Sequence, residues 1–228
     1  MKAIKVDAGE GLQWLSCGWQ LFTKAAGVLV LMGLILFALS LVLNIIPLIG
    51  TFIFLLILPV IVGGLLLAIR TVDEGSNVEI MVLFHCFQDN SRLNPLLILG
   101  AIMLAASAVA GIAMMLYIGN AIMVDFGPGT LLGLLVVLVL QVFIAMAFFY
   151  AIPLVTFELI APIEALKTSY NACLLNIIPL LLFSIIYIIL FFLAIIPFGL
   201  GLILLIPVVF CAVYCSYKSI FRSSEPGP

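Results

Sequence analysis

Long apolar segments alternate with short polar ones along the whole chain. Six apolar segments are long enough to cross a bilayer, since a spanning helix needs about 20 mostly apolar residues. We predict transmembrane helices at approximately 25–46, 48–69, 94–118, 128–157, 175–196 and 198–217. These runs are far longer than the strands of a membrane barrel, which have roughly 10 residues of alternating polarity. The pattern therefore predicts an all-α, polytopic membrane protein with six transmembrane helices.

The connections between the spans fall into two kinds. Three are nearly uncharged turns, around Pro47, around Pro197 and across 117–130, where Asp125 is the only charge and Gly127-Pro128-Gly129 favours a turn. All eight Lys and Arg residues lie in the other connections and in the terminal segments, which the six spans place together on the opposite side of the membrane. Because short loops rich in Lys and Arg remain in the cytoplasm, both termini are predicted to be cytoplasmic.

The three polar segments that precede spans one, three and five share an apolar stripe at helical spacing. The stripes consist of Leu12, Leu15, Trp19 and Phe22, then Ile80, Leu83 and Phe87, then Ile163, Leu166, Tyr170 and Cys173. Each stripe has an aromatic residue in third place, and each segment carries an acid near its start, where the helix dipole favours one. We predict three repeats of an interfacial amphipathic helix followed by a transmembrane hairpin. The units cover approximately 9–75, 76–158 and 159–219 of a single membrane domain, 1–228, with 220–228 as a flexible tail.

Aromatic residues of these segments are the candidate interfacial contacts. They are Trp14, Trp19, Phe22, Phe84, Phe87 and Tyr170. Interfacial helices of this kind lie in the plane of the membrane surface. They either form a cytoplasmic collar that docks a partner or senses lipid, or simply connect the hairpins and anchor them at the interface.

Composition excludes several classes of protein. Of 228 residues, 67% are hydrophobic and 8% charged, whereas soluble domains have roughly 25% charged residues. The net charge of −2 and the scattered basic residues give no sign of a nucleic-acid partner. The first residues lack the apolar core and cleavage site of a signal peptide, so we expect no segment to be removed.

Candidate intramembrane polar residues are few, and no ionisable group lies well within a span. They are Gln141 near the centre of span four, Asn44 and Ser107. Such groups usually form hydrogen bonds between helices, and Gln141 could alternatively bind a substrate. Pro59, Pro153 and Pro207 either kink their spans or open them.

Small residues line one face of span three, namely Gly100, Ala101, Ala105, Ala108 and Gly111. Small residues at this spacing permit close approach of another helix. We therefore expect span three to be the central helix of the bundle or, alternatively, the seam of a dimer.

The cysteines do not suggest a reactive or metal site. Cys17, Cys86 and Cys173 are expected in the cytoplasm, where thiols remain reduced, so a disulfide is not expected. They do not share a helical face, and a lone His85 beside Cys86 is weak evidence for a pair of ligands, which argues against a metal centre. Cys211 and Cys215 are expected to pack as small apolar residues.

Catalytic chemistry has no evident residues, and no cofactor is expected. An enzyme would require a cleft that gathers Glu158, Glu164, Lys167 and His85.

Three sequence stretches resemble a family of uncharacterised bacterial inner-membrane proteins. They are Gly11-Leu-Gln-Trp14-Leu with Gly18-Trp19-Gln-Leu-Phe22, Leu83-Phe84-His-Cys-Phe87, and Pro162-Ile-Glu-Ala165-Leu166-Lys-Thr-Ser169. The chain is more distantly similar to the membrane domain attached to some glycerophosphodiester phosphodiesterases. The resemblance covers nearly the whole chain and implies a six-helix inner-membrane protein without catalytic residues.

These observations favour a non-enzymatic accessory or scaffold subunit. Its partners would be the lipid bilayer and either further copies of itself or another membrane complex. The alternative is a carrier of small molecules or lipids that uses the Pro-containing spans and Gln141.

Overall fold

The chain folds into helices throughout the described regions. The computed structural model describes residues 3–47, 49–123 and 128–221, and describes the side chains among them except those of 116–131. The helices are α1 (Glu10–Lys24), α2 (Ala26–Asn44), α3 (Ile49–Asp73), η1 (Ile80–Phe84, a 3₁₀ helix), α4 (His85–Gln88), α5 (Asn90–Met123), α6 (Pro128–Phe149), α7 (Ala151–Glu158), α8 (Pro162–Leu175), α9 (Ile177–Ile195) and α10 (Leu200–Ile220). These residues contain no β-strand, which confirms the predicted all-α class.

Six stretches have the length and composition of membrane spans, as predicted. They are α2, α3, Asn90–Met115 of α5, Leu132–Glu158 across α6 and α7, α9 and α10. The fourth is interrupted between Phe149 and Ala151. Pro153 contributes to this interruption, because its nitrogen cannot donate to the carbonyl four residues earlier and its ring crowds that carbonyl.

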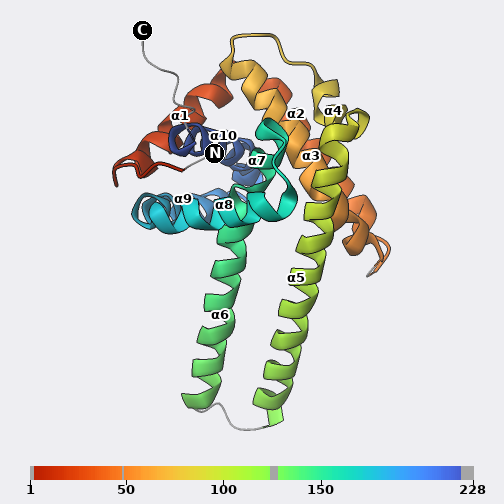
Figure 1. The fold of residues 1–228 in the computed structure, drawn as a ribbon, viewed down its shortest axis with the longest axis vertical. Coiled ribbons are helices and arrows are strands. Elements are labelled where there is room, and N and C mark those ends of the chain that lie inside the picture. The colour runs from red at the N-terminus through yellow and green to blue at the C-terminus, as the bar shows by residue number, and fades with distance from the viewer. Residues whose placement is uncertain (1–2, 48, 124–127, 222–228) are drawn as a thin grey trace.

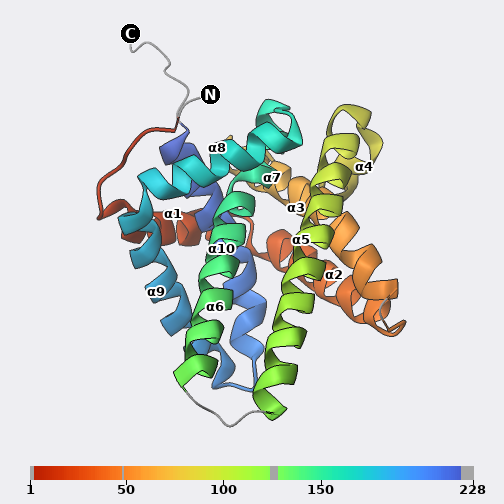
Figure 2. The ribbon, with the colours of Figure 1, turned by 60° about the horizontal axis from the view of Figure 1, so that its bottom comes forward.

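The spans form three hairpins that diverge from a common end of the molecule (Figures 1 and 2). The hairpins are α2 with α3, α5 with α6, and α9 with α10. The turn of the second hairpin, with Asp125 and Gly127, lies partly outside the described residues. Figure 2 shows α1, α7 and α8 near the end where the hairpins converge.

Buried side chains concentrate at this common end. In α2 they are Leu29, Met32 and Leu36, all in the first two thirds of the helix. In α3 they run from Pro59 to Val72, and in α10 from Pro207 to Ile220. The outer parts of the hairpins remain largely exposed, as membrane helices facing lipid do.

The central helix is α3, and the prediction that span three would be central is wrong. In the most apolar stretch of α3, 56% of the residues are buried, compared with 22% in that of α5. Gly100 of α5 does pack closely, because a Cβ there would lie 2.1 Å from the carbonyl oxygen of Leu56. The small residues that follow it, Ala101, Ala105 and Ala108, are exposed instead.

Glycine brings the helices together at the turn of the first hairpin. A Cβ on Gly50 would lie only 1.6 Å from the carbonyl oxygen of Leu43. The turn is also closed by side chains, since Thr51 Oγ1 donates to Asn44 Oδ1 at 3.1 Å and Asn44 Nδ2 donates to the Ser40 carbonyl at 2.7 Å. Asn44 therefore joins α2 to α3 by hydrogen bonds, although its side chain is exposed.

Short helices connect the hairpins at the common end, and we call α1, η1 with α4, and α8 the collar. Each packs on a hairpin other than the one it precedes: α1 on α9 and α10, η1 and α4 on α3, and α8 on α6 and α7, although α4 also contacts the α5 that follows it. The second collar segment is a 3₁₀ turn and a four-residue helix, not the continuous amphipathic helix that the stripe predicted. The threefold sequence repeat and its unit boundaries stay predictions.

The buried face of the collar helices is displaced by one residue from the predicted stripes. In α1 the buried positions are Gly11, Trp14, Gly18, Leu21 and Phe22, and in α8 they are Ala165, Ser169, Ala172 and Cys173. Many of these residues are small, so a search for large apolar side chains selects the neighbouring face.

The packed chain extends further towards its end than predicted. Ile220 and Phe221, assigned by the sequence to a flexible tail, are 0% and 2% exposed. Ile220 also accepts a hydrogen bond from the Ile4 amide at 2.9 Å.

Candidate functional site at the collar

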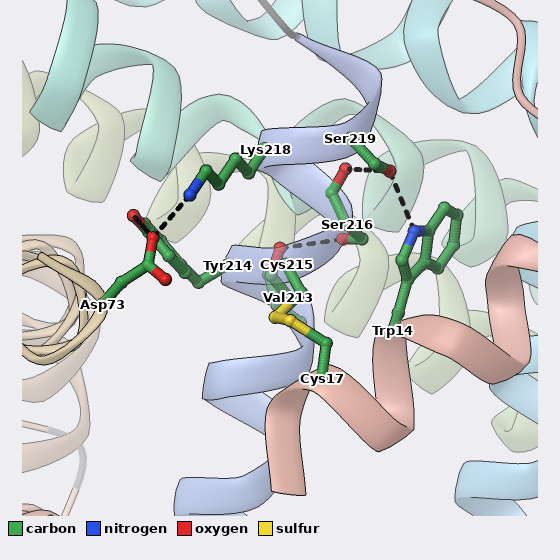
Figure 3. Close-up of a disulfide and its surroundings, with 9 residues drawn as sticks. All are labelled: Trp14, Cys17, Asp73, Val213, Tyr214, Cys215, Ser216, Lys218 and Ser219. Atoms are coloured by element: carbon green, nitrogen blue, oxygen red, sulfur yellow. Dashed lines mark hydrogen bonds and ion pairs between the residues drawn. A yellow bond between two sulfur atoms is a disulfide. The ribbon is translucent and has the colours of Figure 1, made fainter. Parts of the chain in front are cut away.

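The collar is held to the membrane hairpins by specific contacts, the closest of which join α1 to α10. Gly18 allows the two helices to touch, because a Cβ there would lie 2.6 Å from the backbone nitrogen of Ala212. Trp14 is 2% exposed, and its Nε1 donates to Ser219 Oγ at 2.8 Å (Figure 3). Trp14 is therefore a buried anchor that joins the two ends of the chain.

A disulfide between Cys17 and Cys215 crosses the same contact (Figure 3). The Cα atoms are 6.3 Å apart, within the normal range for such a bond. This finding overturns two predictions, that no disulfide would form and that Cys215 would serve only in packing. The first was inferred from the expected cellular compartment, which gives no information about which helices touch.

The N-terminal segment is fixed by a buried asparagine between α8 and α9. Asn176 is 1% exposed. Its Oδ1 accepts from the Val6 amide at 2.9 Å, and its Nδ2 donates to the Ile4 carbonyl at 2.9 Å. The amide side chain thus satisfies main-chain groups that would otherwise lack partners. Nothing in the local sequence pattern predicted this role, although an Asn at the edge of an apolar span is unusual.

Charged and phenolic groups join α3 to the last turns of α10. Asp73 Oδ2 accepts from Lys218 Nζ at 2.7 Å and from the Tyr214 hydroxyl at 3.1 Å (Figure 3). The hydroxyl of Tyr217 donates to Glu158 Oε1 at 3.1 Å, which ties α10 to α7 as well. The side chain of Lys218 is 64% exposed, so its ion pair contributes little to stability.

Arg92 fixes the start of α5 against the end of α7. Its Nε donates to the Thr156 carbonyl at 2.9 Å, and its Nη1 pairs with Asp89. Hydrogen bonds from Ser91, and secondarily from Arg92, hold the pKa of Asp89 below its usual value. Asp89 thus remains ionised near neutral pH.

An open pocket of about 360 Å³ lies between the end of α3 and the second collar segment. It is lined by Leu67, Arg70, Thr71, Glu74, Val82 and His85. Arg70 Nε is 2.8 Å from Glu74 Oε1, and its guanidinium carbon lies 5.6 Å from the centre of the Phe157 ring. The pocket lining includes His85 but not Glu158, Glu164 or Lys167, the groups that an enzymatic cleft would have to gather.

The remaining collar cysteines are buried thiols. Burial raises the pKa of Cys86 to about 11 and that of Cys173 to about 12. Both are therefore protonated and poorly nucleophilic near neutral pH. Within the described residues, no group of three His, Cys, Asp or Glu side chains could hold a metal ion.

The candidate interfacial aromatics divide into two groups. Trp14 and Phe22 are buried in the protein, so they cannot serve as exposed contacts, whereas Trp19 is 53% exposed. The other three, Phe84, Phe87 and Tyr170, are half-buried. Trp19 and Phe22 stack with ring centres 5.7 Å apart, so the exposed indole rests on the buried ring.

The candidate intramembrane polar residues do not gather at one site. Asn44 lies at the turn of the first hairpin, while Ser107 on α5 and Gln141 on α6 are exposed on their helices. A pocket of about 280 Å³ between α9 and α10 has a mostly apolar lining of Tyr187, Phe191, Leu202, Leu205, Ile206, Val209 and Phe210.

Comparison with known proteins shows a distant relative that aligns with the whole chain. The chain is 25% identical over 260 residues to a Burkholderia thailandensis protein whose name describes it as a probable inner membrane protein; the match covers 100% of this chain and 96% of the relative. The chain is a multi-pass inner-membrane protein. No family model and no solved structure matches it. No comparison supports the distant likeness to the membrane domain of glycerophosphodiester phosphodiesterases.

Proposed function

We propose that this inner-membrane protein is a non-enzymatic accessory or scaffold subunit that associates with further copies of itself or with another membrane complex. The observation that carries the proposal is the uncovered small-residue face of α5. Ala101, Ala105 and Ala108 are exposed, and a Cβ on Gly111 would meet no atom within 4 Å.

The spacing of these residues places them on one side of the helix. Residues three and four apart are neighbours on a helix surface, so Ala101, Ala105 and Ala108 form a continuous strip. Association of membrane helices depends on close packing of small residues, because lipid tails are as apolar as a leucine side chain. The strip is a suitable surface for another membrane helix.

The position of the packed core supports the same function. The collar fixes the hairpins at one end, through contacts such as Trp14 with Ser219 and Ser169 with Tyr150. The outer part of α5 can then bind a neighbouring helix without disturbing that core. Hairpins that are fixed at one end and exposed along the rest of their length support a role in organising other membrane helices.

The carrier alternative receives less support from the geometry. It would use Gln141, whose side chain is exposed on α6. The pocket between α9 and α10 offers an aromatic and aliphatic lining with little polar surface, which would not orient a polar solute.

The mass of the native protein tests the proposal. Extraction from the membrane in a mild detergent, followed by native mass spectrometry, should show a homo-oligomer or a complex with other membrane proteins. A persistent monomer that co-purifies with no other protein would contradict the proposal.

A further inference from the structure

The bond between Cys17 and Cys215 joins the collar helix α1 to α10, and the two cysteines are 198 positions apart in the sequence. We propose that these two cysteines form a reversible redox site, which exchanges with the dithiol of a thioredoxin-type protein and thereby controls how firmly α1 is held on α10. The inference concerns the collar alone and does not depend on the proposed scaffold function.

Neighbouring charges indicate the compartment in which this bond must survive. Cys17 precedes Lys24 on α1, and Cys215 precedes Lys218 by three residues on α10. Basic residues of short segments favour the cytoplasmic side. Disulfides in that compartment are usually transient and either catalytic or redox-sensing, because cellular thiol systems reduce them. A cysteine pair placed there is suited to the reversible formation and reduction of a disulfide.

The two sulfur atoms differ in accessibility, which fixes the direction of attack. Cys215 is 5% exposed, whereas Cys17 is half-buried on a helix with an exposed outer face. An incoming thiolate therefore attacks Cys17 Sγ and forms a mixed disulfide. The bond between the cysteines breaks, and its electron pair goes to Cys215 Sγ, which takes up a proton.

The exchange is completed by the second thiol of the donor. It attacks the donor's own sulfur in the mixed disulfide, and Cys17 leaves with the electron pair and takes up the second proton. The donor dithiol is oxidised to a disulfide, and the protein gains two electrons and two protons. The reverse sequence closes the site at the expense of an oxidised donor.

Opening the bond leaves α1 in place but less constrained. The hydrogen bond from Trp14 to Ser219 and the close approach of Gly18 to Ala212 do not involve sulfur. A covalent link between distant positions stabilises the folded chain by restricting the unfolded one. Reduction should therefore lower the unfolding temperature and speed amide exchange in α1, without detaching the helix.

Counting thiols in the intact membrane protein tests the proposal. Thiols are trapped with acid, and the denatured chain is then labelled with a mass-tagged maleimide. With five cysteines in the chain, the untreated cellular protein should give five labels. Brief treatment with the thiol oxidant diamide should give three, and removal of the oxidant should restore five. Purified oxidised protein in lipid nanodiscs should likewise pass from three labels to five with thioredoxin, its reductase and NADPH.

Matched variants identify the cysteines involved. Cys17→Ser and Cys215→Ser should each give four labels under every condition, whereas Cys211→Ala should still switch, between four and two. Three labels that persist in the presence of the thioredoxin system would show a permanent structural bond and overturn the proposal. Five labels that persist after diamide would overturn it equally. The third contrary result is equal amide exchange in α1 for the oxidised and reduced proteins.

Discussion

The hydroxyl of Ser169 in α8 accepts a hydrogen bond from the Tyr150 amide at 2.9 Å, at the break between α6 and α7 in the second half of the fourth membrane span. The same hydroxyl donates to the Met146 carbonyl at 2.8 Å. It therefore occupies the place of the main-chain hydrogen bond that would join these residues in a continuous helix. Insertion of a side chain into this ladder is a known cause of helix breaks, and here it joins the collar to the break.

Replacement of this hydroxyl should destabilise the protein. In Ser169→Ala the buried Tyr150 amide loses its partner, and the Met146 carbonyl keeps only the weaker hydrogen bond from the Cys173 thiol at 3.4 Å, at a cost of about 1–3 kcal/mol. The matched variant is Thr156→Val, because Thr156 Oγ1 is buried without a hydrogen-bond partner. That variant should be neutral or slightly stabilising. Thermal unfolding in detergent measures both, and a stable Ser169→Ala protein would contradict the assigned role.

The contact between α1 and α10 should be equally sensitive to the size of residue 18. In Gly18→Ala the new methyl group meets the backbone of Ala212, which cannot move aside as a flexible side chain would. We expect a loss of about 1–3 kcal/mol from overpacking. Gly27→Ala is the control, since a Cβ there meets no atom within 4 Å, and it should not lower the unfolding temperature. Equal behaviour of the two variants would show that α1 does not pack on α10 in this way.

The two tryptophans should also behave differently. Trp14→Phe removes the donor to Ser219 from a buried site, although Ser219 keeps its own bond to the Ser216 carbonyl at 3.1 Å. We expect a loss of at least about 1 kcal/mol from the hydrogen bond and the lost volume together. Trp19→Phe, at an exposed position, should change the unfolding temperature little. Tryptophan fluorescence of each variant gives an independent check, because the indole left in Trp19→Phe should be the one shielded from aqueous quenchers.

Helix content and the number of spans followed from apolar run lengths, because each depends only on local sequence. The run lengths did not predict which helices contact one another. Cys17 and Cys215, or Asn176 and Val6, meet only because α1 packs on the last hairpin, and no local spacing encodes that contact. The predicted stripes selected large residues such as Trp19, whereas the buried faces use Gly18 and Ser169. Small residues at a helix contact carry little hydrophobic signal, and this explains the displacement by one position.

The buried thiols give a prediction on pH. Burial raises the pKa of Cys86 to about 11, so its reactive thiolate is scarce near pH 7 and increases about tenfold for each unit of rising pH. Iodoacetamide should label Cys86 in the native protein far more slowly than in the denatured one. Since the folded pKa exceeds the ordinary value of 9.0, the protonated thiol favours the folded state, and this contribution declines as the pH rises from 9 towards 11. Rapid labelling of native Cys86 at pH 7 would contradict its burial.

Association through α5 is the central claim, and a substitution on that helix, compared with one on α9, tests it most directly. Ala108 lies on the exposed small-residue strip, whereas Ile188 is 50% exposed on α9. Ala108→Phe should lower the association constant, measured by native mass spectrometry or by cross-linking in lipid nanodiscs, by about tenfold or more, because a bulky ring prevents close helix approach. Ile188→Phe should leave it nearly unchanged, and both variants should keep the parent unfolding temperature. Equal association of Ala108→Phe and the parent protein would contradict the account.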